Sequence, residues 1–513
     1  MGASHREFYT EHVAETQRRW EAALEAEGFA AVAVHSGTPM YAFQDDYEYA
    51  FRPNPHFLAW LPLTHHADSL LLVLPGERPR LFYFQPDDYW YQPPADPESW
   101  WADHFDIEIV RDAMAWRERL EAVLSSRGLS PGAIAMIGDS PALEGHVRDE
   151  SLNPAGLVTR LQLWRTRKTP YEVACMDEAS RLAAAAHLEA ERAFREGASE
   201  FDMHLRYQAA CRQTDTELPY NNIVALNEHG AVLHYQQRDI EPPAQSRSFL
   251  IDAGAAVNFY ASDITRTYAR EEGEFADMIR AMDAVQRDLV GRVRIGLDYR
   301  DLFLDSHLAI AGVLRDAGVI RATPEDALES GLSRVFYPHG LGHFLGLQVH
   351  DVAGLIDNEG VPIPRPEGHP ALRLTPVLET GNVLTVEPGL YFIDTLLRKW
   401  RAEGDASMVD WDRVAALRPY GGVRIEDDIL VTRRGQLGVG RLQLACMRAQ
   451  VARLARMCAR QLGEIIGQLA QFGRTRPVEH HRPVRLQGLL HALGQVAPDA
   501  FCTPGDPSGH KDL

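Results

Sequence analysis

Long apolar runs and cysteine are both scarce in this sequence of 513 residues. The longest apolar runs, such as residues 70–74, are far shorter than the ~20 residues that span a bilayer. The N-terminal residues soon become charged and contain no apolar signal core. The five cysteines are scattered and include no CxxC pair, which excludes a disulfide framework. These absences predict a cytoplasmic protein without a membrane segment.

Positive charge is also in short supply. The 52 Lys and Arg residues face 72 Asp and Glu residues, which gives a net charge of -20. Proteins that bind nucleic acid need a basic surface for the phosphates, so this charge argues against nucleic acid as a partner and suits a site for divalent cations. The remaining composition is ordinary for a globular protein, and the length predicts two or more domains.

Sequence patterns divide the chain into three parts. Residues 1–165 predict an α/β domain with a mixed sheet, in which a helix covers 11–27 and buried strands cover 30–35, 69–74 and 79–84. Arg165 to Thr169 is interpreted as a linker. Pro170 then begins a helix that runs to about Phe194 and closes near Gly197. Residues 166–431 alternate helices with β-hairpins and form the second domain.

Two stretches, 42–60 and 85–101, are unusually aromatic. We interpret them mainly as loops that pack against the core, with an interface or a pocket wall as the alternative.

Residues 432–513 differ from the rest. From Arg434 onward, eleven Lys and Arg residues outnumber five Asp and Glu residues. Apolar residues at spacings of three and four predict a helix over about 441–472, and the Pro, His and Gly content after Gly473 predicts little fixed structure. This extension is either a genuine appendage or the product of a shifted reading frame, and neither alternative gives it a catalytic role.

Two aspartates lie close to apolar strands. Asp252 ends the run FLIDAG, and Asp263 opens the run DITRT eleven residues later. A hairpin through residues 258–260 could bring the two carboxylates together. Two buried carboxylates repel each other unless they share a proton or a cation.

Three further segments carry similar side chains. His343 lies in the glycine-rich segment PHGLGHFLG, Glu387 ends the strand LTVE, and Glu426 shares a strand face with Arg424. The glycines allow close approach of the backbone, and the HExxH zinc motif is absent. Together with the two aspartates, these residues supply four carboxylates and one imidazole, which suits two divalent ions such as Mn²⁺ or Co²⁺.

These motifs, together with residues 35–37, 223–229, 347–354 and 423–427, resemble the pita-bread metallopeptidases, specifically the bacterial Xaa-Pro dipeptidases (prolidases). The resemblance runs from about residue 7 to about residue 431. It implies an α+β catalytic domain with a curved antiparallel sheet flanked by helices. It also implies a homodimer that hydrolyses Xaa-Pro dipeptides with a hydroxide activated by two metal ions, and a side activity on organophosphorus esters or fluorides.

The resemblance also implies metal-binding roles. Asp252 would bind one metal, Asp263 and Glu426 would bridge both metals, and His343 and Glu387 would bind the other metal. Glu387 would also pass a proton to the leaving prolyl nitrogen.

Substrate roles follow from the same resemblance. His234 and His350 would donate hydrogen bonds to the peptide oxygen, and Arg373 would bind the C-terminal carboxylate in a bidentate pair. Residues with supporting roles would be Tyr220 in the pocket lining, Arg424 beside the bridging carboxylates or in the pocket, His339 behind the His343 turn, and Asp46 in the partner subunit's site.

Two other interpretations stay open. A catalytically silent peptide-binding module would have lost metal ligands, whereas all five are present. Another enzyme on the same fold, an aminopeptidase for longer Xaa-Pro peptides or a creatine-type amidinohydrolase, is disfavoured by the matches around Asn227, Gln348 and His350.

Overall fold

Strand β1 (Ala31–His35) shows how the N-terminal sheet is buried on both faces. All of its residues are buried, and alternation sends Val32 and Val34 to one core and Ala31 and Ala33 to another. In the computed structural model, which describes residues 4–138 and 151–438, β1 pairs antiparallel with β2 and parallel with β5. The order β4-β3-β2-β1-β5 makes a five-stranded mixed sheet.

The elements of this region match the expected helix and the three expected strands to within about two residues at each end. They are β2 (Leu70–Val73), β3 (Arg80–Phe84), β4 (Asp106–Val110), β5 (Ile134–Ile137), α1 (Tyr9–Glu27), α2 (Pro55–Leu58), α3 (Trp116–Ser126) and α4 (Ala155–Arg165). Helix α1 packs Trp20 and Leu24 on one face of the sheet, and α3 packs Trp116 and Leu120 on the other.

Helix α5 (Pro170–Glu196) begins and ends where local chemistry predicts. Thr169 and Glu172 form a reciprocal capping box, in which the Thr169 N–H donates to the Glu172 carboxylate at 2.7 Å. Pro170 occupies the first turn, and Gly197 closes the helix in the left-handed conformation. The predicted helix is therefore confirmed.

The predicted linker is confirmed as the short connection between α4 and α5, and buried ion pairs hold it in place. Arg165 and Lys168 are buried, and both contact the carboxylate of Asp351, with the Lys168 Nζ 2.9 Å from Oδ2. Arg165 also donates to the Gln348 side chain at 3.0 Å. Buried ion pairs thus tie this connection to the segment that carries His350.

Residues 170–438 form short antiparallel strands between two helix layers. The strands are β6 (Ile223–Leu226), β7 (Ser248–Ala253), β8 (Ala256–Val257), β9 (Tyr260–Ala261), β10 (Ile264–Ala269), β11 (Val383–Val386), β12 (Gly389–Tyr391), β13 (Gly422–Arg424), β14 (Asp427–Thr432) and β15 (Gly435–Gly438). The helices after α5 are α6 (Glu200–Cys211), α7 (Glu274–Arg292), α8 (Tyr299–Asp316), α9 (Pro324–Glu329), α10 (Ser333–Phe336), α11 (Asp394–Glu403) and α12 (Trp411–Leu417).

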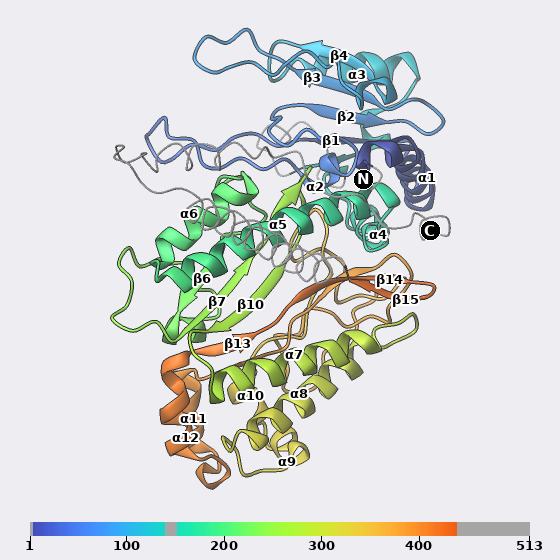
Figure 1. Cartoon of the computed structure of the whole chain (residues 1–513). Coiled ribbons are helices and arrows are strands. Elements are labelled where there is room, and N and C mark those ends of the chain that lie inside the picture. The colour runs from blue at the N-terminus through green and yellow to red at the C-terminus, as the bar shows by residue number, and fades with distance from the viewer. Residues whose placement is uncertain (1–3, 139–150, 439–513) are drawn as a thin grey trace, which may run out of the picture. The chain divides into compact units, whose positions relative to one another are not determined.

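These strands pair as β10-β7-β6, β11-β14-β15, β12-β13 and β8-β9. The bridges Thr265–Glu426 and Phe344–Leu384 join them further. Helices α5 and α6 lie on one side of the strands, and α7 and α8 lie on the other (Figure 1). The expected α+β architecture, an antiparallel sheet flanked by helices, is confirmed.

The two aromatic stretches divide between core and surface. Phe57, Trp60 and Trp101 are buried, as loop packing predicts. Phe43 and Trp90, however, are 89% and 78% exposed, so the packing interpretation is wrong for the neighbourhood of each.

The expected helix over 441–472 lies outside the described residues. None of the helices within residues 4–138 and 151–438 has the length and apolar character that crossing a bilayer requires.

Candidate metal centre

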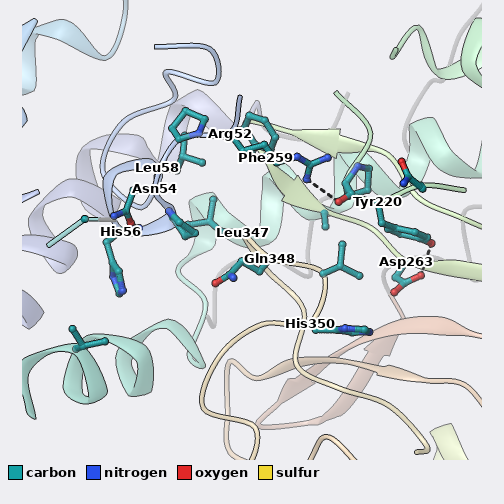
Figure 2. Close-up of a pocket in the computed structure, with 18 of the residues that line it drawn as sticks. Arg52, Asn54, His56, Leu58, Tyr220, Phe259, Asp263, Leu347, Gln348 and His350 are labelled. Carbon is teal, nitrogen blue, oxygen red and sulfur yellow. Dashed lines mark hydrogen bonds between the residues drawn. The ribbon is translucent and has the colours of Figure 1, made fainter. Parts of the chain in front are cut away.

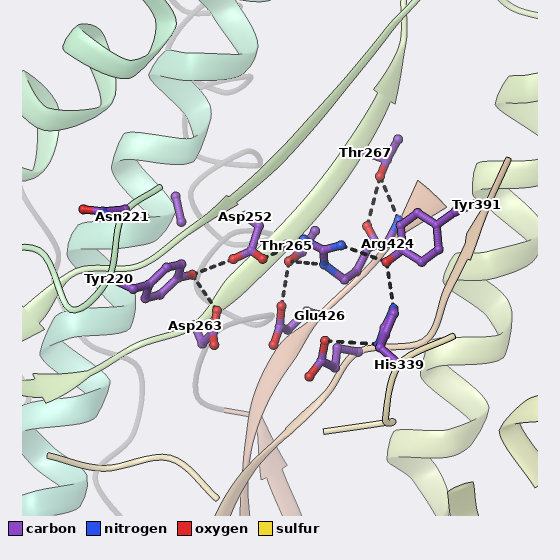
Figure 3. A network of polar contacts seen from close by, with 12 residues as sticks. Tyr220, Asn221, Asp252, Asp263, Thr265, Thr267, His339, Tyr391, Arg424 and Glu426 are labelled. Carbon is purple, nitrogen blue, oxygen red and sulfur yellow. Dashed lines mark hydrogen bonds and ion pairs between the residues drawn. The ribbon is translucent and has the colours of Figure 1, made fainter. Parts of the chain in front are cut away.

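A hairpin brings the two aspartates together. Asp252 lies on β7, and Asp263 directly precedes β10, which pairs antiparallel with β7. Between them, β8 and β9 turn through Asn258 and Phe259, both in the left-handed conformation. The predicted hairpin is confirmed. The Tyr220 hydroxyl lies 2.7 Å from Asp252 Oδ1 and 2.5 Å from Asp263 Oδ1 (Figure 3).

Two glycines allow main-chain contact beside these ligands. A Cβ atom on Gly254 would lie 1.9 Å from the carbonyl oxygen of Ser262, and one on Gly342 would lie 2.1 Å from that of Thr385. Neither distance is compatible with a side chain, so only glycine fits. Gly342 immediately precedes His343, which explains the glycine-rich sequence around this histidine.

The backbone also sets the orientation of His343. Its N–H donates to the Thr385 hydroxyl at 3.2 Å, and its Nδ1 lies 2.9 Å from the carbonyl oxygen of Phe344. The Nδ1–H therefore donates to that carbonyl, and Nε2 is the nitrogen that faces the carboxylates. Nε2 lies 3.5 Å from Asp263 Oδ2 and 3.8 Å from Glu387 Oε1. A metal-binding histidine usually has this orientation, in which Nδ1–H donates to a backbone carbonyl and Nε2 faces the other ligands.

Glu426 joins this cluster from the short connection between β13 and β14, which forms a bridge with Thr265 of β10. The Thr265 hydroxyl donates to Glu426 Oε2 at 2.6 Å. Ligand-type atoms of Asp263, His343 and Glu426 all lie within 4.8 Å of one another, and all three residues are buried. The segments that supply these atoms are distant in sequence.

Arg424 supplies a positive charge at the edge of the cluster. Its guanidinium donates to Asp252 Oδ2 at 2.6 Å, to the Thr265 hydroxyl at 3.2 Å and to the Tyr391 hydroxyl at 2.8 Å. Of the two roles expected for Arg424, the structure shows the place in the cavity lining, and its carboxylate contact is with Asp252 and not with Asp263 or Glu426. His339 Nε2 lies 2.8 Å from the same tyrosine hydroxyl, and its Nδ1 lies 3.8 Å from Glu387.

The electrostatics of the site favour added positive charge. Burial raises the pKa of Glu387 to about 7, and burial together with Asp263 raises the pKa of Glu426 well above its ordinary value. Although burial disfavours the charged form of His343, its carboxylate neighbours raise the pKa of this imidazole to about 9. Without a cation, the cluster therefore retains protons.

The donor set fits divalent cations. Carboxylate oxygens and one imidazole are suitable ligands for hard to borderline ions. The Tyr220 hydroxyl has one proton and therefore satisfies only one of the two carboxylates that it contacts. The second carboxylate is left for a proton or a cation.

Two cavities meet at this cluster. One has a volume of about 380 Å³ and is lined by His343, Arg373, Glu387, Arg424 and Glu426 among others. The other, of about 930 Å³, extends past Tyr220 and Gln348 towards Arg52 and His56 (Figure 2). The residues shared by both linings are His234, Asp252, Asp263 and His350. All expected site residues except Asp46 line at least one cavity.

Of the expected site residues, His350 lies beside the metal-binding cluster, whereas Asp46 lies away from it. The ring of His350 lies 4.4 Å from that of His343, nearly perpendicular to it, and burial lowers the pKa of His350 to about 4. Its imidazole is therefore neutral near pH 7 and can donate one hydrogen bond. Asp46 is exposed in the loop that also carries Phe43, and it lines neither cavity.

Sequence reasoning assigned no role to three residues that support the site. Thr265 binds Glu426, and Tyr391 joins Arg424 to His339. Asp428 Oδ2 accepts a hydrogen bond from the Asp263 N–H at 3.1 Å. The signals for Thr265 and Asp428 were present, because each lies two residues along a strand from a ligand. Tyr391 had no comparable signal, since its partners belong to other segments.

Comparisons with known proteins agree with this geometry. Residues 7–163 match the family Xaa-Pro dipeptidase, N-terminal domain, and residues 174–433 match metallopeptidase family M24. A Xaa-Pro dipeptidase from Stenotrophomonas maltophilia (strain R551-3) is 50% identical over 428 residues, 83% of this chain and 94% of its own. One from Xanthomonas campestris pv. campestris (strain 8004) is 47% identical over 427 residues, 83% of this chain and 95% of its own.

Solved structures share the fold at lower identity. Escherichia coli aminopeptidase P with the inhibitor Pro-Leu has a TM-score of 0.63 at 22% identity, covering 85% of this chain and 99% of its own. Proline aminopeptidase P II from Yersinia pestis has a TM-score of 0.62 at 22% identity, with the same coverage. This likeness shows the pita-bread fold.

Proposed function

Because this chain belongs to metallopeptidase family M24, we propose that it hydrolyses the peptide bond of Xaa-Pro dipeptides with the help of two divalent metal ions. The observation that carries the proposal is the convergence of Asp252, Asp263, His343, Glu387 and Glu426 beside a cavity of about 380 Å³. Relatives that are 47–50% identical over most of their length are named Xaa-Pro dipeptidase.

The ligand assignment is the one that the resemblance implies, and the clustering of these side chains around one cavity supports it. Asp252 would hold one metal, Asp263 and Glu426 would hold both, and His343 and Glu387 would hold the other. Four carboxylates neutralise the formal charge of two divalent ions, and oxygen ligands with one imidazole favour Mn²⁺, with Co²⁺ as the alternative. When bound, two such ions lower the pKa of water towards ~7 and polarise the carbonyl group.

Residues of the chain orient the substrate and move its proton. His234 and His350 line both cavities and donate hydrogen bonds to the peptide oxygen. Glu387 accepts the proton that the attacking water loses and releases it to the prolyl nitrogen as the peptide bond breaks. Tyr220 and Arg424 fix the position of Asp252 by hydrogen bonds of 2.7 and 2.6 Å.

Recognition of a short substrate depends on its C-terminal carboxylate. Arg373 is exposed to the smaller cavity, where its guanidinium pairs with this carboxylate in bidentate fashion. A peptide that continues beyond proline has no carboxylate at this point. The longer substrate therefore lacks this charge-assisted hydrogen bond and should bind less tightly.

The test is hydrolysis by the purified protein with Mn²⁺, measured as release of free proline or alanine. We expect cleavage of Ala-Pro and Gly-Pro, and little cleavage of Ala-Pro-Ala; Ala-Ala reports the need for proline. Rapid cleavage of Ala-Pro-Ala would identify an aminopeptidase instead. Two bound metals without hydrolysis of any peptide would identify a binding module.

Finer assignments accompany this function. We propose that the protein is cytoplasmic. We also propose a homodimer in which Asp46 reaches the partner subunit's site, supported by the exposed aromatic side chains Phe43 and Tyr47 beside it. Light scattering tests the dimer, and Asp46→Ala tests the role of Asp46. Hydrolysis of organophosphorus esters or fluorides is proposed because the same site can attack phosphorus. The domains are placed at 1–165 and 166–431, with 432–513 as an extension.

A further inference from the structure

Glu200 is a buried glutamate that the proposed mechanism does not use. It lies in the first turn of α6 and is 1% exposed. Its Oε1 accepts from the Leu226 N–H at 2.7 Å and lies 2.8 Å from His229 Nδ1. Its Oε2 accepts from the Tyr235 hydroxyl at 2.8 Å and from the Asp239 N–H at 2.9 Å. A carboxylate has about four acceptor sites, so this one is saturated.

Because both oxygens of Glu200 already accept hydrogen bonds, we can decide whether the side chains around Glu200 form a metal site or a hydrogen-bonded anchor. Ligand-type atoms of Glu200, His229 and Asp239 lie within 4.8 Å of one another, as in a metal site. A cation here would have to displace hydrogen bonds that already occupy both oxygens of Glu200, and Asp239 is exposed. The cluster is therefore a hydrogen-bonded anchor and not a second metal centre.

The anchor holds one particular loop. Its four donors come from residues 226–239, and His234 lies between them in the lining of both cavities. The rings of His229 and Tyr235 stack with centroids 4.6 Å apart. The loop is thus attached to Glu200 on both sides of His234. Asn227 secures its base by accepting from the Arg247 N–H at 2.7 Å.

We propose that Glu200 is a positioning residue for the hydrolysis, which holds the loop so that His234 faces the bound peptide. The inference rests on the proposed function, because His234 meets a peptide only if the metal centre binds one. An exposed loop moves more than the scaffold around it. Four hydrogen bonds to a helix restrict this movement, and misplacing a substrate-orienting group by about 1 Å can reduce the rate about 100-fold.

The test is a double-mutant cycle with Glu200→Gln and His234→Ala in the full-length protein with Mn²⁺. Glutamine keeps the size of the side chain but replaces one acceptor oxygen with a donor. We expect E200Q to lower kcat/KM for Ala-Pro about 10- to 100-fold, mainly through kcat. In the H234A background it should have no further effect, because coupled residues are not additive. Wild-type kinetics of E200Q, or full additivity, would overturn the proposal.

Glu172→Gln is the matched control. Glu172 is also a buried glutamate, but it binds the Thr169 N–H and the Tyr260 hydroxyl. E172Q should lower the thermal midpoint without any coupling to His234; coupling as strong as that of E200Q would show a general loss of structure and overturn the proposal. If E200Q does not fold, Tyr235→Phe, which removes one of the four donors, takes its place in the cycle.

Hydrogen exchange separates this inference from the proposed function. The amides of residues 226–239 should exchange faster in E200Q than in the wild type and in E172Q, and this measurement needs no substrate. Unchanged exchange in E200Q would overturn the proposal. A wild-type protein without activity on Ala-Pro refutes the proposed function alone, and the exchange comparison still decides whether Glu200 holds the loop.

Discussion

Asp351→Asn should destabilise the protein more than the loss of any surface ion pair. The carboxylate of Asp351 lies between Arg165 and Lys168, and the side chains of Asp351 and Lys168 are 2% and 1% exposed. Asparagine keeps the shape but removes the negative charge that both cations share. Breaking a buried ion pair typically costs about 3–5 kcal/mol because it leaves an uncompensated charge. Here two cations lose their partner, so we expect a loss in the upper part of this range.

The effect should depend on pH. Although burial favours the neutral acid, Arg165 and Lys168 hold the pKa of Asp351 below its ordinary value. A carboxyl group with a lowered pKa in the folded state stabilises the protein above its unfolded-state pKa, about 3.9. This stabilisation is lost as the pH falls through the folded-state pKa. The difference between wild type and D351N should therefore be full at neutral pH and shrink in acid.

The assay is urea unfolding of both proteins without added metal, at neutral pH and at several acidic pH values. Glu274→Gln serves as the control, because Glu274 pairs with Arg413 at 3.0 Å on the surface, and such pairs contribute about 0–1 kcal/mol. A loss below about 1 kcal/mol in D351N would refute the reasoning. So would a loss that stays constant as the pH falls.

Three further predictions concern the metal centre. Asp263→Asn should remove bound metal and reduce hydrolysis of Ala-Pro at least about 100-fold, more than losing an outer partner of a ligand; metal analysis and kinetics check this, and retained activity would mean that the ligand set is wrong. Removal of metal with EDTA should abolish hydrolysis and lower the thermal midpoint, since an ion that binds only the folded state stabilises that state; an unchanged midpoint would contradict metal binding. Arg373→Ala should raise KM for Ala-Pro about 10- to 100-fold, because a hydrogen bond to a charged group contributes about 1.5–3 kcal/mol. Ala-Pro amide, which lacks the carboxylate, should be affected little, and an equal effect on both would contradict the assigned role.

Local chemistry made much of the fold predictable. Pro170 and Gly197 marked the ends of α5, and the continuous apolar run of β1 indicated a buried strand. The five proposed ligands were also visible, because a carboxylate at the end of an apolar strand needs a partner. Their joint occurrence, and not any single motif, indicated metal chemistry.

Contacts between distant segments were not predictable. Arg165 and Asp351 are 186 residues apart, and no periodicity connects them. The sequence therefore predicted a linker between α4 and α5 but not the buried ion pairs that hold it. Glu200 gave no signal either, because its donors belong to a loop. Phe43 and Trp90 were interpreted as packed, since an aromatic residue in a loop has the same sequence signature whether it is buried or exposed.

Main-chain contact at Gly254 and Gly342 makes the spacing of the proposed ligands a property of the backbone. Segments that touch cannot move closer, and the hydrogen bonds between the neighbouring strands oppose separation. The backbone therefore holds the proposed ligands at a set spacing. An ion of unsuitable radius would have to stretch or compress its own coordination bonds, since the protein cannot close around it. Selection among divalent ions should therefore follow bond length and preferred coordination geometry.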